Sequence, residues 1–150
     1  MDRSRPKADW RDTPSWGRTA LIVTIMLGIA LIHVFRIGAY LSDPLFTLYY
    51  SYFSDIVIPF GMYFLLCQSD WLVRPLRDWR VKALLVFGVA SCTEVMQAFG
   101  VPLLGQTFDP LDLVMFGVGV LLAAFVDRFV FHPLLPCWSP KTEGPSDAPR

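Results

Sequence analysis

The sequence predicts an all-α, polytopic membrane protein with four transmembrane helices. Hydrophobic residues make up 54% of the 150-residue chain, and its mean hydropathy is +0.46. Four apolar runs, each close to the length that a helix needs to cross a bilayer, alternate with short charged or proline-containing segments. We therefore divide the chain into a basic tail at 1–18, a membrane domain at 19–131 and a second tail at 132–150.

The first span is predicted from Thr19 to about Tyr40. The tail before it holds five Lys and Arg residues, and its two tryptophans are typical of a segment that approaches the membrane interface. The apolar run is long enough to remain as a span, so we do not expect a cleaved signal peptide. Near its far end, His33, Arg36 and Tyr40 are spaced to share one side of a helix.

The second span can be divided in two ways. Asp43 and the proline after it predict a helix start, and the aromatic segment at about 44–53 is typical of a helix lying in the outer interface. Asp55 would then begin a separate membrane helix that ends near Val73. The alternative is one continuous helix from Leu45 to Cys67, which would place Asp55 near the middle of the membrane. We favour the broken version.

The third span is predicted at about Val81–Phe99, after a short basic loop at residues 74–82. Gly100 and Pro102 are expected to end this span, because glycine is favoured just after a helix and proline cannot continue one.

The fourth span is predicted from Pro110 to about Phe131. Asp109 is the expected N-cap, and Pro110 takes the first helical position, where a missing N–H costs little. The segment at 132–150 is rich in proline and charge, so we expect it to be a disordered tail.

The distribution of basic residues predicts the orientation. Four spans place both termini on one side, and twelve of the thirteen Lys and Arg residues lie in the tails, the middle loop or the segments next to them. Only Arg36 lies in the other two connections. By the positive-inside rule, we expect a multi-pass membrane protein with both termini in the cytoplasm. The polar stretch at 91–116 then faces outward.

Glu94 is the strongest candidate for a functional residue. It lies about five residues, or roughly 7 Å of helical rise, inside the predicted end of the third span, where no capping role explains it. An acid inside an apolar span is costly and indicates a functional or structural polar role, although a position at the membrane rim is the alternative. We further expect Arg36 to pair with Glu94, Asp55 or Asp112. The complete candidate binding pocket is Glu94, Gln97, Gln106, Asp109, Asp112, Arg36, Asp55 and His33.

Catalytic and metal-binding patterns are missing from the sequence. It has no nucleophile elbow, no Ser-His-Asp order, no phosphate loop and no metal-ligand spacing. Its three cysteines are an odd number, and two lie in apolar runs, so they do not suggest a disulfide framework. We therefore expect no catalytic residue, no cofactor and no metal site.

The polar stretch resembles the VanZ-like family of small bacterial membrane proteins. The family's Glu-x-x-Gln and Asp-x-x-Asp elements are matched by Glu94-Val-Met-Gln97 and Asp109-Pro-Leu-Asp112, and its apolar entry to the second span is similar to Ile58-Pro59-Phe60-Gly61. The similarity covers about residues 20–131. Gln106 stands at the family's arginine position and Phe116 at its asparagine position. The stretch around Gln106 also resembles a second group of bacterial proteins with four or five spans.

The resemblance implies a location in the bacterial cytoplasmic (inner) membrane, a role in the cell envelope and a link to glycopeptide (teicoplanin) susceptibility. We expect a non-catalytic protein whose outward-facing acidic pocket binds a lipid head group or a lipid-linked envelope precursor. The alternative is a proton- or cation-coupled carrier, or a membrane enzyme, that uses Glu94. A third reading is a helper subunit that packs against another membrane protein. Membrane lipids are expected partners in every case, and nucleic acid in none.

Overall fold

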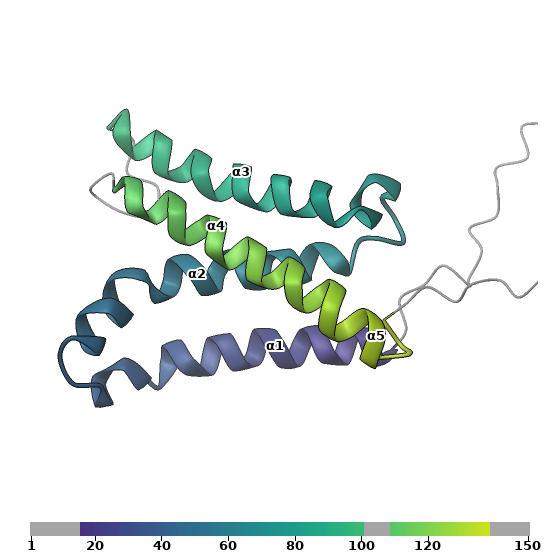
Figure 1. The fold of residues 1–150 in the computed structure, drawn as a ribbon, viewed down its shortest axis with the longest axis horizontal. Helices are drawn as coiled ribbons and strands as arrows, with labels where there is room; N and C mark the ends of the chain where they lie inside the picture. Colours follow the sequence, from purple (N-terminus) through teal and green to yellow (C-terminus); the bar gives the residue numbers. More distant parts are fainter. Residues whose placement is uncertain (1–15, 101–108, 139–150) are drawn as a thin grey trace, which may run out of the picture.

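The structure is a computed structural model that describes residues 16–100 and 109–138. All of the regular elements in this part of the chain are helical. Four helices are long and apolar enough to cross a membrane, at Trp16–Val34, Leu45–Cys67, Trp79–Ala98 and Pro110–Leu134. The predicted all-α architecture with four membrane-spanning helices is therefore confirmed (Figure 1).

Helix α1 (Trp16–Val34) ends before the predicted limit at Tyr40. The backbone turns at Arg36, which adopts a left-handed conformation with φ of 47°, and then forms the 3₁₀ helix η2 (Ile37–Tyr40). A right-handed α-helix requires a negative φ, so α1 cannot continue through Arg36. Non-glycine residues rarely adopt the left-handed conformation found here.

Helix α2 (Leu45–Cys67) is continuous, and the favoured division into an interfacial helix and a separate span is wrong. The aromatic residues at its start pack on each other and on η2: Tyr49 stacks on Phe53 with ring centroids 4.4 Å apart, and the Tyr49 ring covers Gly38. Because these contacts hold the first turns in line with the rest of α2, Asp55 lies near the middle of the helix. Pro59 is accommodated inside it at the cost of one backbone hydrogen bond.

The predicted basic loop is largely helical. Arg74–Arg77 form the 3₁₀ helix η3, and α3 (Trp79–Ala98) begins immediately after Asp78. The Asp78 side chain caps α3 by accepting the backbone N–H of Arg80 at 2.9 Å. At the other end, α3 stops before Gly100, whose φ of 80° suits glycine, as predicted. Pro102, the other predicted stop residue, lies outside the described residues.

Helix α4 (Pro110–Phe125) begins where the sequence predicts. The Asp109 carboxylate accepts the backbone N–H of Leu111 at 2.9 Å, which confirms its capping role. The helix then widens into the π-helix η4 (Val126–Phe131) and ends with one turn, α5 (His132–Leu134).

The predicted tail begins too early. The described chain continues through α5 to Trp138, whose side chain is only 2% exposed. Its indole packs against Phe131 and Phe64, with ring centroids 4.9 and 6.0 Å away. This segment buries aromatic surface that composition alone could not assign to the core, and residues 139–150 lie outside the described part of the chain.

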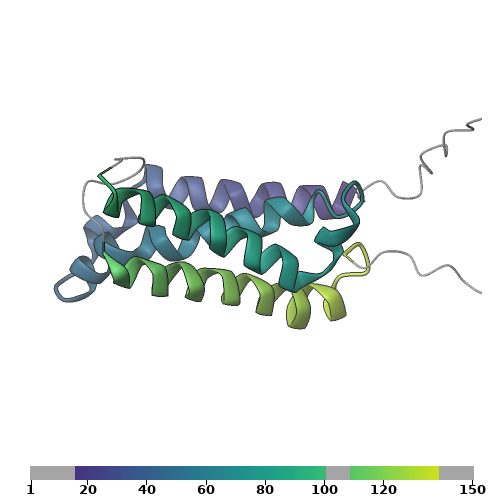
Figure 2. The same cartoon turned by 90° about the horizontal axis from the view of Figure 1, so that it is seen from above.

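Helices α2, α3 and α4 pack together, and α1 lies along α2 (Figures 1 and 2). The α2–α4 contact is the most extensive and brings the two backbones very close. A Cβ atom on Gly119 would lie 2.1 Å from the carbonyl oxygen of Ile56, so only glycine fits there. The core beside this contact contains Tyr63, Phe64, Val86, Val120 and Ala123.

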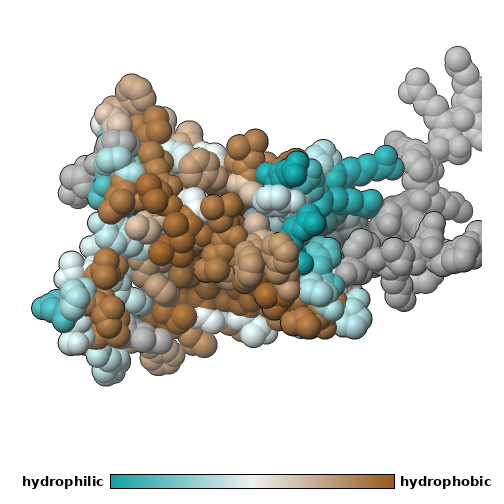
Figure 3. Space-filling model, in the orientation of Figure 1, coloured by the Kyte–Doolittle hydropathy of each residue, from teal (hydrophilic) through white to brown (hydrophobic). Residues whose placement is uncertain are grey.

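The molecule has an apolar middle and two polar ends of different character. In Figure 3 hydrophobic residues cover the middle of the visible face, and hydrophilic residues gather at the right, where α1 begins and α5 lies in Figure 1. We call that end, formed by the start of α1, η3, the start of α3, η4 and α5, the basic end. The opposite end, formed by η2, the start of α2, the end of α3 and the start of α4, is the acidic end.

Candidate functional site

Four carboxylates from three helices gather toward the acidic end. Asp55 comes from α2, Glu94 from α3, and Asp109 and Asp112 from the start of α4. Asp55 and Asp112 each interact electrostatically with Glu94, with Asp109 and with each other. The structure thus brings together four of the eight residues predicted for the binding pocket.

Glu94 is the most buried member of this carboxylate cluster (Asp55, Glu94, Asp109 and Asp112), with an exposed fraction of 3%. One of its oxygens, Oε1, accepts the backbone N–H of Asp109 at 2.8 Å. This bond joins the end of α3 to the start of α4, so Glu94 helps to hold these two helices in register. Gln97 lies about one turn further along α3 and is half-buried.

Arg36 does not pair with this cluster. The ion pairs in the described part of the chain join other residues, so the hypothesis that Arg36 binds Glu94, Asp55 or Asp112 is wrong there. The left-handed turn at Arg36 directs the chain into η2 instead. Arg36 lines a separate cavity of about 300 Å³ whose other lining residues are His33, Tyr49, Tyr50, Phe53 and Ser54.

His33 also lies apart from the carboxylates. Its Nδ1 is 2.9 Å from the carbonyl oxygen of Ile29, and its Nε2 is 3.3 Å from the hydroxyl of Ser54 on α2. It is therefore a hydrogen-bonded link between α1 and α2. The eighth predicted residue, Gln106, lies outside the described residues.

A second polar cluster, at the basic end, was missed by the sequence analysis. Lys82 and Asp127 are 3% and 1% exposed, and the Lys82 ammonium lies 3.4 Å from Asp127 Oδ2 and 3.3 Å from Asp70 Oδ2. Asp70 also accepts a hydrogen bond from the Arg18 guanidinium at 2.6 Å. This buried ion network (Arg18, Asp70, Lys82 and Asp127) connects α1, the turn after α2, α3 and η4.

Asp127 has further partners that complete the network. Its two carboxylate oxygens accept the Tyr63 hydroxyl at 2.8 Å and the indole N–H of Trp138 at 2.6 Å. Charges this deep are stable only when they are paired and hydrogen-bonded, and here they are. Lys82 was predicted to end the short basic loop at residues 74–82, but it lies in α3 and in the interior of the bundle.

One signal for this network was present in the sequence. Asp127 lies within the fourth apolar run, as Glu94 lies within the third, and the same argument about an acid in an apolar span applies to it. Its partner Lys82 lies at the start of the third run, 45 residues earlier. Opposite charges at the same end of these two spans make an ion pair possible, but the sequence does not show that the two spans are neighbours.

The carboxylates do not form a metal site. Among residues 16–100 and 109–138, no group of three or more His, Cys, Asp or Glu side chains is arranged to hold a metal ion. The three cysteines in these ranges are all free thiols.

Comparisons with protein-family models, with curated proteins and with solved structures give no match to this chain.

Proposed function

We propose that this chain is a VanZ-like protein of the bacterial cytoplasmic membrane that binds a cationic head group at its acidic end without catalysing a reaction. The ligand would be the amine of a phospholipid or of a lipid-linked envelope precursor. The observation that carries the proposal is the convergence of four carboxylates from three helices. The fold is that of a four-span membrane protein, but the link to the envelope and to glycopeptide susceptibility rests on the sequence resemblance alone.

The charge balance at the acidic end favours a cationic ligand. No Lys or Arg occurs between residues 83 and 127, and Arg36 is the only one between 19 and 73. The described part of the chain contains no ion pair to any of the four acids. Clustered carboxylates that lack a cation repel each other, so a bound amine would relieve that repulsion. A protonated amine also supplies three hydrogen-bond donors, whereas a phosphate would add negative charge.

The proposed orientation is testable first. The start of α1 and helix α5 both lie at the basic end (Figure 1), and we infer from the distribution of Lys and Arg that this end faces the cytoplasm. A periplasmic reporter fused after Arg150 is expected to be inactive, and a cytoplasmic reporter fused there active. The opposite result would place the acidic end in the cytoplasm and refute an outward-facing pocket.

The binding proposal is tested on the full-length protein in detergent by native mass spectrometry. Phosphatidylethanolamine, which carries an amine, is compared with phosphatidylglycerol, which has none. We expect Glu94→Gln to remove the preference for the amine lipid at this end. Asp43→Asn is the matched control, because Asp43 is an exposed acid on the same end whose carboxylate lies 3.4 Å from the Thr47 hydroxyl. Equal amine binding by wild type and Glu94→Gln would refute the proposal.

A second candidate function arises from the same cluster. A buried acid beside three other carboxylates is also suited to exchange protons or to pass a monovalent cation. Proteoliposomes with a pH-sensitive dye inside distinguish the two functions. Ion flux that is abolished by Glu94→Gln but kept by Asp43→Asn would favour a carrier, and tight vesicles would favour the binding function.

A further inference from the structure

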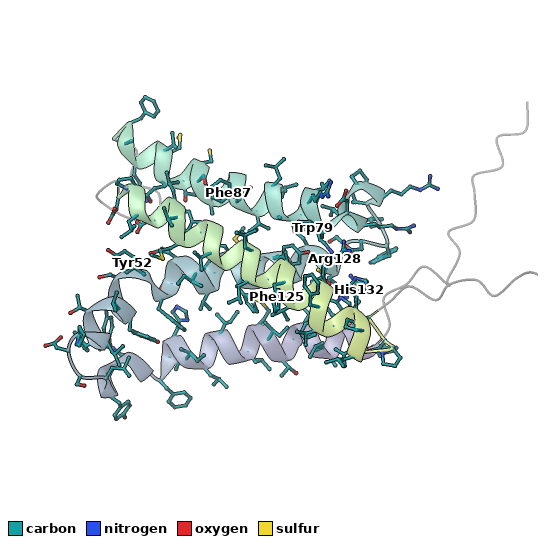
Figure 4. All side chains as sticks on the ribbon, in the orientation of Figure 1. Tyr52, Trp79, Phe87, Phe125, Arg128 and His132 are labelled. Carbon is teal, nitrogen blue, oxygen red and sulfur yellow. The ribbon has the colours of Figure 1, made fainter. Side chains whose placement is uncertain are left out.

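The basic end contains a cavity of about 400 Å³ that belongs to neither the carboxylate cluster nor the first proposal. It lies where η3, the start of α3, η4 and α5 meet. In Figure 4 the labelled side chains of Trp79, Arg128 and His132 lie close together at this end. The lining residues are Arg77, Asp78, Trp79, Arg80, Asp127, Arg128 and His132.

Two arginines are held in place here by an aromatic ring. The guanidinium carbon of Arg80 lies 5.7 Å from the centroid of the Trp79 ring, and that of Arg128 lies 5.9 Å from it. Both distances are in the range of cation–π interactions. Within the described residues neither arginine takes part in an ion pair, so their charge is not compensated by a carboxylate there.

The two acids in the lining are already engaged. Asp127 accepts hydrogen bonds from Tyr63 and Trp138 and pairs with Lys82 inside the bundle. Asp78 accepts a backbone N–H as the cap of α3. Within the described residues neither acid forms an ion pair with Arg77, Arg80 or Arg128. Asp127 is offset by Lys82, so the three arginines of the lining outnumber its one remaining carboxylate, Asp78, and the cavity is positively charged overall.

We propose that this cavity binds an anionic phosphate group. A guanidinium group can donate two parallel hydrogen bonds to two oxygens of a phosphate. Arg80 on α3 and Arg128 on η4 lie beside the same cavity, so they can bind one phosphate from separate helices. Arg77, which lines the same cavity, adds a third positive charge. The phosphate belongs either to the head group of an anionic phospholipid or to a soluble phosphate ester. A basic pocket between helices at the end of a bundle suits the first of these sources.

The test uses the full-length protein in a neutral detergent and measures binding by native mass spectrometry and calorimetry. The probes are short-chain phosphatidylglycerol, short-chain phosphatidylcholine and glycerol phosphate. We expect phosphatidylglycerol to bind more tightly than phosphatidylcholine, whose phosphate is compensated by choline. If glycerol phosphate displaces the lipid, the site also accepts soluble phosphate esters. If it does not, the phosphate that the site binds is that of a lipid head group. Either result, together with the preference for phosphatidylglycerol, supports a phosphate site.

Matched variants assign the binding to the cavity. Arg128→Gln is expected to weaken phosphatidylglycerol binding about tenfold, the usual effect of losing one charge-assisted hydrogen bond. Arg74→Gln removes the same charge from an exposed position on η3 that does not line the cavity, and it is expected to change binding less than about twofold. Arg80→Gln changes a second exposed arginine of the cavity and provides the same test if Arg128→Gln folds poorly.

Two results would overturn the proposal. The first is equal affinity of the wild-type protein for the two lipids, with no measurable binding of glycerol phosphate. The second is an equal loss of binding in Arg74→Gln and in the cavity variants, because that would indicate attraction by the overall charge of this end. Circular dichroism confirms that each variant retains its helices before binding is compared.

Discussion

Removing the Asp127 carboxylate tests whether the buried ion network holds the bundle together. Asp127→Ala leaves the Tyr63 hydroxyl and the Trp138 indole N–H without their acceptor and deprives Lys82 of one of its two carboxylates. Each unpaired buried donor costs about 1–3 kcal/mol, and removing one partner of a buried ion pair typically costs about 3–5 kcal/mol in total. We expect the free energy of unfolding to fall by about 3–5 kcal/mol.

The measurement is unfolding of the purified protein in mixed micelles with increasing dodecyl sulfate, followed by circular dichroism. Asp78→Ala is the control, because it removes an exposed acid that caps α3 and lies outside the buried ion network, and it should cost about 1 kcal/mol. The double variant Lys82→Met/Asp127→Leu replaces both charges by apolar groups. Its loss of unfolding free energy should be at least about 1 kcal/mol smaller than the summed losses of Lys82→Met and Asp127→Leu measured singly. The reason is that neither charge is then left buried without its partner.

Two outcomes would refute this reasoning. If Asp127→Ala were no less stable than Asp78→Ala, the network would contribute nothing to stability. If the double variant lost the full sum of the two single effects, Lys82 and Asp127 would not be coupled, and the ion pair would be incidental to the fold.

Three other substitutions test separate contacts in the same unfolding assay. Gly119→Ala should lower the free energy of unfolding by about 1–3 kcal/mol, because the new Cβ would meet a backbone carbonyl of α2. Gly88→Ala is the control and should be neutral or stabilising, because no atom lies near the Cβ position there. Equal effects of the two changes would contradict the close helix contact. Trp138→Ala should cost about 3–5 kcal/mol, since the indole is buried, and a cost near zero would mean that this segment does not close the bundle. Glu94→Leu leaves the Asp109 N–H unpaired and should cost about 1–3 kcal/mol more than Glu94→Gln; indifference to both changes would make Glu94 a rim acid.

The sequence was most informative where the physical signal is local. Hydropathy located the four spans, and the Asp109-Pro110 pair located the start of α4, because a cap and a proline act on the residues beside them. The signal at Asp55 misled for a related reason. An aspartate often lies at the start of a helix, but Asp55 lies inside α2, where the aromatic packing of Tyr49 and Phe53 continues the helix.

The candidate site was predicted in part. Glu94 stood out because an acid in an apolar span has no local explanation, and the neighbouring Asp109 and Asp112 follow from the connectivity of α3 and α4. The pairing of Lys82 with Asp127 depends on which spans lie side by side, and hydropathy does not determine that. The expected pairing of Arg36 failed because its backbone turn could not be predicted from residue type.

The π-helix η4 has a consequence for the length of this segment. A π turn contains about one residue more than an α turn, so η4 is equivalent to a one-residue insertion into α4. Each residue in an α-helix advances the direction of the side chains by about 100°. Asp127 lies at the start of η4 and Trp138 lies beyond its end, yet the two form a hydrogen bond. Deleting one residue from η4 would make the helix more regular, but it would rotate the following segment and carry Trp138 away from the core. The spacing between these two residues is therefore constrained independently of which side chains lie between them.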